Sequence, residues 1–160
     1  MRGGPVEQAP IERRPDVLVY TSSALEDDLE VSGPVELVLY AESSARDTDF
    51  VARVTDVDPA GRSLVLTEGI LRARYRGGLE RMELLEPNEA AEFRVRLYPM
   101  SHVFRAGHRI RLQVTSSCFP RFTRNLNTGE DVGTGTRMQT ARNTVLHTAA
   151  YPSHLRLPSR

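Results

Sequence analysis

We first ask whether any serine in this sequence has the flanking residues of a catalytic nucleophile. Nucleophilic hydrolysis on an α/β-hydrolase scaffold needs a serine on a sharp turn of the form G-x-S-x-G, because small flanking residues permit that turn. No such pentapeptide occurs; Ser32 precedes Gly33 and Ser63 follows Gly61, each with only part of the spacing. We therefore predict no catalytic residue in this chain.

The histidines and the single cysteine are the candidates for a general base or a transition-metal ligand. The histidines stand at positions 102, 108, 147 and 154, and no two of them form an H-x-x-x-H or H-E-x-x-H pair. His102 and His108 flank a turn and are expected to hydrogen-bond to it. We predict no metal site and no cofactor.

Four aspartates could offer oxygen ligands to a hard cation. Asp47, Asp49, Asp56 and Asp58 lie within twelve residues of sequence, but their spacing does not match a helix-loop-helix calcium loop. Short acidic side chains at strand entries commonly cap their own backbone turns. Turn capping is the favoured interpretation, and a bound ion remains the alternative.

A long segment at 116–142 has no core-forming period, and long ordered loops are usually functional. Within it Phe119, Arg121, Phe122, Arg124 and Asn125 form an unusual cluster of aromatic, arginine and amide side chains. Exposed aromatics beside arginines are typical of interfaces, so these five residues are our candidates for a docking surface or active-site rim. The alternative is that the two phenylalanines plug the open end of the fold.

The glycines at 129–135 superficially resemble a phosphate-binding loop. That segment lacks the following lysine and helix, and Glu130 and Asp131 would repel a phosphate. We expect a flexible loop there. In the domain made alone, we also expect Arg121, Arg124, Arg137 and Arg142 to lack acidic or carbonyl partners.

The sequence predicts that these residues are positioned by short β-strands, which are separated by turns containing Gly, Pro, Asp and Asn. Expected strands cover 16–20, 35–41, 50–57, 63–67, 93–97, 110–115, 144–147 and 155–157. The absence of crossover helices between them indicates an all-β fold, an antiparallel two-sheet sandwich with a jelly roll as the favoured form. Only 79–89 has modest helical character. Residues 1–15 are expected to be a linker or edge-packed arm, and 16–160 the sandwich domain.

Composition narrows the classes of partner. The chain has 160 residues, 39% hydrophobic and 26% charged, as in a single globular domain. Basic and acidic residues balance at 21 each, so we expect neither nucleic-acid nor membrane binding. One cysteine and no apolar leader favour a cytoplasmic location.

Several segments in order carry a resemblance to a known family. They are DVLVYT at 16–21, the stretch 31–40 with Ser32, Gly33 and Pro34, DTDFVARVTDV at 47–57, GILRARYR at 69–76, SHVFRAGHRIR at 101–111, and 116–129 with its FPRF and NTG elements. This order and spacing resembles the C-terminal domain of the X-Pro dipeptidyl-peptidase and cocaine-esterase family over nearly the whole chain.

The resemblance implies a galactose-binding-like jelly roll that packs against an α/β-hydrolase domain, which supplies the Ser, Asp and His of the triad. No triad position has a counterpart here. We therefore expect a structural and docking domain that is inactive alone, with its hydrolase partner in cis as in the family, or in trans. The alternative is a free-standing carbohydrate-binding module, although the chain has no tryptophan. With its docking face uncovered, the isolated domain is expected to self-associate.

Overall fold

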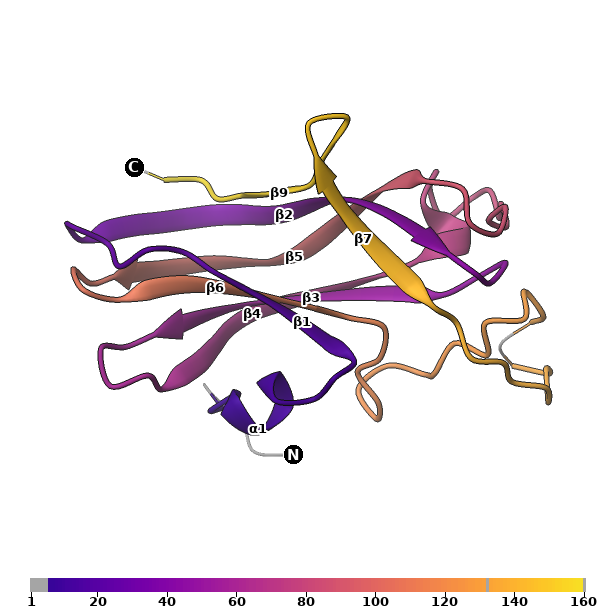
Figure 1. The fold of residues 1–160 in the computed structure, drawn as a ribbon, viewed down its shortest axis with the longest axis horizontal. Coiled ribbons are helices and arrows are strands. Elements are labelled where there is room, and N and C mark those ends of the chain that lie inside the picture. Colours follow the sequence, from indigo (N-terminus) through magenta and orange to yellow (C-terminus); the bar gives the residue numbers. More distant parts are fainter. Residues whose placement is uncertain (1–5, 132, 160) are drawn as a thin grey trace.

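A computed structural model describes residues 6–131 and 133–159 and shows two antiparallel β-sheets packed face to face (Figure 1). The four-stranded sheet has the order β1-β6-β3-β4, formed by Val17–Thr21, Arg109–Thr115, Asp49–Val57 and Ser63–Arg72. The five-stranded sheet has the order β5-β2-β7-β8, formed by Ala91–Phe104, Leu29–Ser43, Asn143–Thr148 and Tyr151–Pro152, and β9 (His154–Arg156) also pairs with β2. The expected all-β, two-sheet antiparallel sandwich is confirmed; the jelly-roll subtype stays a prediction.

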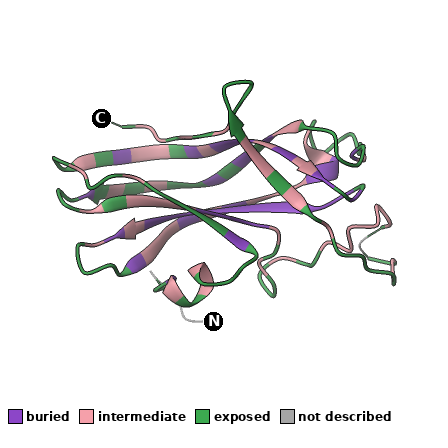
Figure 2. Ribbon diagram, in the orientation of Figure 1, coloured by how far each residue is buried: buried purple, intermediate pink, exposed green. Residues whose placement is uncertain are grey.

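Alternation along the strands explains the core between the sheets. In β2, Val35, Leu37 and Leu39 point inward and are buried, as the alternating pattern predicts. Phe50 of β3 faces Phe93 of β5 with ring centroids 4.6 Å apart, which joins the two sheets at the centre of the core. Figure 2 shows the buried residues concentrated on these inner strands.

The helical elements lie outside the segment where we expected helical character. Residues 79–89 form turns and irregular structure, because Gly77, Gly78 and Pro87 interrupt any helix there. The described helices are a single turn, α1 (Ala9–Glu12), and a 3₁₀ turn, η1 (Ala73–Tyr75). Neither is long enough to span a bilayer.

Residues 6–8 pair with the edge of β4, and Glu12 lies against β6 of the same four-stranded sheet. The Gln8 amide nitrogen of the backbone donates to the Ser63 carbonyl at 2.8 Å, and Gln8 is buried. Glu12 at the end of α1 pairs with Arg111 of β6 at 2.6 Å. These contacts place the described part of the N-terminal segment on the sandwich and close to β6.

The two lateral edges of the sandwich differ. At one edge, called here the closed edge, β4 lies directly against β5; the Thr67 hydroxyl donates to the Tyr98 carbonyl at 2.6 Å. A Cβ added to Gly69 would lie 2.2 Å from the Arg96 carbonyl oxygen, so glycine is required for this approach. At the other edge, the open edge, β1 faces β7 and β9 across a groove of about 480 Å³.

Candidate docking site

The two serines that we considered as nucleophiles lie within the β-sandwich and take part in its hydrogen bonding. The Ser63 side chain is buried, 2.6 Å from the Glu12 carboxylate and 2.8 Å from the Thr55 hydroxyl. Ser32 lies within β2, where its backbone amide donates to the Pro158 carbonyl. In the described residues neither hydroxyl has a histidine partner, so neither has the base that a nucleophilic serine requires.

Two histidines share one carboxylate instead of hydrogen-bonding to the turn that they flank. His102 Nε2 lies 3.0 Å from one Asp56 oxygen, and His108 Nδ1 lies 2.8 Å from the other. Asp56 belongs to β3 and His102 to β5, so the cluster links the two sheets. Its role in the fold is therefore cross-linking, and our assignment of the two rings to the turn backbone was wrong.

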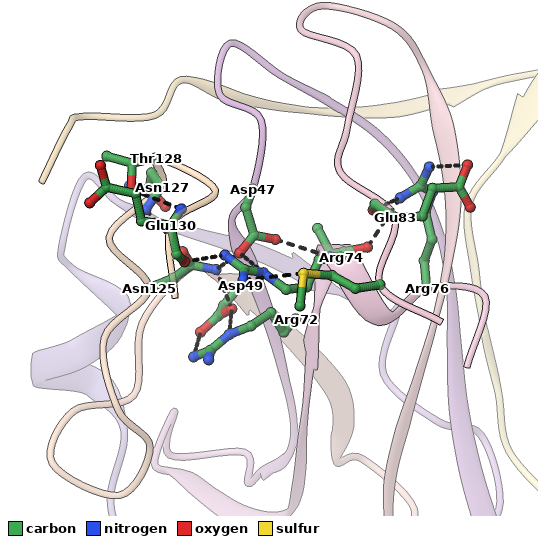
Figure 3. A network of polar contacts seen from close by, with 12 residues as sticks. Asp47, Asp49, Arg72, Arg74, Arg76, Glu83, Asn125, Asn127, Thr128 and Glu130 are labelled. Atoms are coloured by element: carbon green, nitrogen blue, oxygen red, sulfur yellow. Dashed lines mark hydrogen bonds and ion pairs between the residues drawn. The ribbon is translucent and has the colours of Figure 1, made fainter. Parts of the chain in front are cut away.

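Asp47 and Asp49 form a buried network with two arginines, which replaces the turn capping that we expected for them (Figure 3). Arg74 Nε donates to Asp47 at 2.8 Å, and Arg72 Nε donates to Asp49 at 2.9 Å. Both aspartates are almost fully buried. The hydrogen bonds that Arg72 donates to Asp49 raise the pKa of Arg72. Arginines thus neutralise the carboxylates that a cation would otherwise bind.

Asn125 joins the long loop to this network. Its side-chain nitrogen donates to Asp47 at 2.7 Å and to Asp49 at 2.8 Å (Figure 3). Arg74 reaches the same loop by donating to the Glu130 carbonyl at 2.8 Å. The loop therefore has a fixed attachment to the ends of β3 and β4 and is not held by its own contacts alone.

The sequence contained a signal for this network that we did not use. Asp47 and Asp49 are two residues apart, and so are Arg72 and Arg74. Residues two apart on a strand point to the same face, and the register pairs Asp49 with Arg72. Matching spacings of opposite charge, at the start of one strand and at the end of the next, could have predicted the pairing, although Asp47 and Arg74 lie just outside the strands.

Phe119, Arg121, Phe122 and Arg124 lie together near the closed edge and form what we call the loop surface. Phe119 is 62% exposed, and the Arg124 guanidinium lies 4.8 Å from its ring centre. Arg121 pairs with Glu68 of β4 at 2.6 Å, and its guanidinium lies 5.7 Å from the Phe122 ring centre. Stacking of this kind fixes planar arginines and leaves their edges available for hydrogen bonds.

Two of the loop arginines have acidic partners, contrary to our expectation. Arg121 is paired with Glu68, and Arg137 is paired with Glu130. Among the residues described, no group of three His, Cys, Asp or Glu side chains could hold a metal ion. The chemistry available at the loop surface is therefore binding through aromatic and guanidinium groups.

Comparison with known proteins gives the same assignment for sequence and structure. Residues 4–156 match the X-Pro dipeptidyl-peptidase C-terminal non-catalytic domain. The chain is 44% identical to the cocaine esterase of Rhodococcus sp. (strain MB1 Bresler) over 157 residues, which is 97% of this chain and 27% of the esterase.

Two solved structures share the fold closely. An aminopeptidase from the marine sediment archaeon Thaumarchaeota archaeon superimposes with a TM-score of 0.93 at 32% identity, and an α-amino acid ester hydrolase with 0.92 at 31%. Each match covers 96% of this chain and 27% of the larger one. The chain thus spans about a quarter of the length of these relatives, and it belongs to the family of X-Pro dipeptidyl-peptidase C-terminal non-catalytic domains.

Proposed function

We propose that this chain is a structural and docking domain for an α/β-hydrolase portion of the kind that its relatives carry, in cis or in trans. The main support is that this chain matches only 27% of the length of a cocaine esterase. The matching part is a β-sandwich, and its described residues include no serine hydrogen-bonded to a histidine. Fold similarity does not carry a site that is missing. The isolated chain should therefore provide contacts and no hydrolysis.

The loop surface is the part that we assign to the rim of the hydrolase active site. Phe119 offers a large exposed ring, and Arg121 and Arg124 are held beside aromatic rings. Aromatic and arginine side chains dominate binding energy at protein interfaces. Asn125, also a candidate, would act by holding the loop in place, because its amide is bound to Asp47 and Asp49.

A chimera tests the docking role. The Rhodococcus esterase with its matching C-terminal part replaced by this chain should hydrolyse a short-chain ester and unfold at a higher temperature than the esterase truncated before that part. The isolated chain should leave the ester and a chromogenic X-Pro amide intact and should not react with a fluorophosphonate. Serine labelling of the isolated chain, or a chimera no more stable than the truncated esterase, would contradict the proposal.

The rim assignment needs a separate measurement in the same chimera. Phe119→Ala with Arg124→Ala should raise KM for the ester, and in the isolated chain the same changes should leave the unfolding temperature within about a degree, because both side chains are exposed there. Met138→Ala is the matched control, since Met138 is 69% exposed in the same loop. Equal kinetics in all three proteins would remove the loop surface from the rim.

A further inference from the structure

The groove at the open edge reaches into the hydrophobic core. It lies between β1 and β6 of one sheet and β2, β7 and β9 of the other. Its apolar walls include Leu37, Leu39, Leu112, Val114, Leu155 and Leu157. The polar groups that line it are hydroxyl and imidazole groups with no carboxylate or guanidinium among them. A binding site of about 480 Å³ with such walls suits an uncharged, apolar occupant.

Two core-facing residues of β1 are incompletely covered at this edge: Tyr20, which lines the groove, and Leu18, two residues before it on the same face of the strand. Leu18 pairs in register with Val114, and Tyr20 with Leu112, so both point toward the core side of the sheet. Leu18 is nevertheless 42% exposed and Tyr20 is 37% exposed. Core-facing positions are exposed here because the groove separates β1 from β7 and β9 of the opposite sheet. Apolar burial would be gained if another element covered them.

The backbone of β1 also has a free edge. In the described residues β1 pairs with β6 and with no other strand. The Ser22 amide donates to the Ile110 carbonyl at 2.9 Å. Because antiparallel pairs alternate in their hydrogen bonding, Tyr20 and Leu18 direct their amides to β6, and Val19 and Thr21 direct theirs away from it. These outward groups are available to another strand.

Neither described end of the chain fills this space. Residues 6–8 pair with the edge of β4, and Glu12 pairs with Arg111 of β6. The C-terminal segment pairs with β2 as β9 and forms a wall of the groove through Leu155. Both described ends are therefore already placed against other parts of the sandwich.

We infer that the open edge receives an extended, alternately apolar segment of the hydrolase portion, which pairs with β1 and places its apolar side chains in the groove. This inference rests on the proposed function and names the contact by which the two parts join. A strand satisfies both observations, the free backbone edge and the uncovered apolar face. The relatives supply the source, since the chain matches only 27% of their length.

Other occupants satisfy only one of the observations. A second copy of this chain could pair β1 with β1, but the core-facing side chains of its β1, Leu18 and Tyr20, would remain over its own groove. An apolar small molecule would cover the walls and leave the β1 backbone unpaired. A sugar would meet walls that are mostly apolar and offer few hydrogen-bond partners.

Hydrogen exchange tests the pairing directly. We would compare the isolated chain with the esterase chimera and follow the backbone amides of Val19 and Thr21. In the isolated chain these amides should exchange rapidly, and in the chimera their exchange should slow by at least about tenfold. The amides of Tyr20 and Leu18, already bonded to β6, serve as internal references.

A substitution on the core-facing side of β1 adds an independent readout. Leu18→Gln should lower the unfolding temperature of the chimera by several degrees more than that of the isolated chain, because the strand of the hydrolase portion would cover the part of Leu18 that the isolated chain leaves exposed. Leu79→Gln is the matched control, since Leu79 is 85% exposed on a turn far along the chain. It should be neutral in both proteins.

The outcomes separate this inference from the proposed function. A stable, active chimera in which Val19 and Thr21 exchange as fast as in the isolated chain overturns the strand and leaves the docking role standing. Protection that appears in the isolated chain on raising its concentration assigns the edge to a second copy and also overturns it. A chimera that does not fold or act contradicts both proposals. Protection of both amides together with a Leu18→Gln effect that is larger in the chimera supports the inference.

Discussion

The two lateral edges of this sandwich are closed by different means. At the closed edge, β4 approaches β5 so tightly that Gly69 has no room for a Cβ and Thr67 donates across the gap to Tyr98. At the open edge, β1 meets β7 only near Tyr20 and His147, whose ring centroids lie 6.0 Å apart. One edge is therefore complete within the chain, and the other has core-facing residues that the chain itself does not cover.

This difference suggests where a partner contributes to the fold. A domain stable by itself buries its inward-facing apolar residues, as β3 does with Phe50 and Val54. The partial exposure of Leu18 and Tyr20 marks the place where residues outside this chain could complete the burial of the core. The same comparison predicts that substitutions of one chemical type should have unequal effects at the two edges.

The largest effect is expected for Gly69→Ala at the closed edge. The new Cβ would stand 2.2 Å from the backbone oxygen of Arg96, and backbone atoms cannot move aside as a flexible side chain can. We expect a loss of at least about 3 kcal/mol in the free energy of unfolding, measured by chemical denaturation.

Gly77→Ala is the control for that substitution, because an added Cβ at Gly77 meets no atom within 4 Å. Its unfolding free energy should stay within about 0.5 kcal/mol of the parent chain. Similar stabilities for the two variants would mean that β4 and β5 do not approach so closely.

Next in size is a matched pair of Leu→Ala changes. Leu97 of β5 is buried in the core, and Leu155 of β9 is a partly exposed wall of the groove. Leu97→Ala should cost about 3 kcal/mol, and Leu155→Ala about 1 kcal/mol, since less apolar surface is lost from burial at the open edge. Equal costs in denaturant unfolding would show that the open edge is covered in the isolated chain.

A smaller effect is expected from a hydroxyl at the closed edge. Thr67→Val removes the donor to the Tyr98 carbonyl and should lower the unfolding free energy by about 1 to 2 kcal/mol. Thr144→Val on β7 is the control, because Thr144 is exposed and its hydroxyl has no recorded partner among the described residues. Thermal unfolding of the two variants should separate them by several degrees; coincident curves would argue against a bridging role for Thr67.

The strands were predictable from sequence, but their full lengths were not. Each of the eight expected segments lies within or overlaps a strand of the structure. The expected strand at 35–41 is part of β2, which continues back to Leu29 through a bulge at Gly33 and Pro34. Likewise Pro99 lies inside β5, an edge strand, where a missing amide is tolerated. Glycine and proline were taken as strand ends when they were irregularities within strands.

The loop and the edges depend on contacts that are distant in sequence. The cluster from Phe119 to Asn125 was identified from residue types alone, but its attachment through Asp47 and Asp49 joins residues more than 70 positions apart. The groove was not predicted, because a strand pattern gives the faces of each strand and not the partner opposite. Only the three-dimensional arrangement shows that a groove separates β1 from the strands opposite its inward face.

The smallest expected effect is a pH dependence that reports on the open edge. Partial burial raises the pKa of Tyr20 above its ordinary value near 10. The folded chain therefore holds this proton more tightly than the unfolded chain, so its contribution to stability is present below about pH 10 and is lost as the pH rises through the folded pKa. Tyr20→Phe should remove this part of the alkaline decline in unfolding temperature.

Tyr40 provides the comparison for that titration, because its pKa is raised chiefly by the hydrogen bond to Glu92 at 2.7 Å and to a smaller extent by burial. Glu92→Gln should therefore shift the tyrosinate absorbance transition of Tyr40 and leave that of Tyr20 unchanged. If a strand of the hydrolase portion covers the groove, the transition of Tyr20 should move to still higher pH in the chimera, since burial disfavours the phenolate. The transition of Tyr40 should not move with it. An unchanged Tyr20 transition in an active chimera would mean that the open edge stays exposed to water after the two parts have joined.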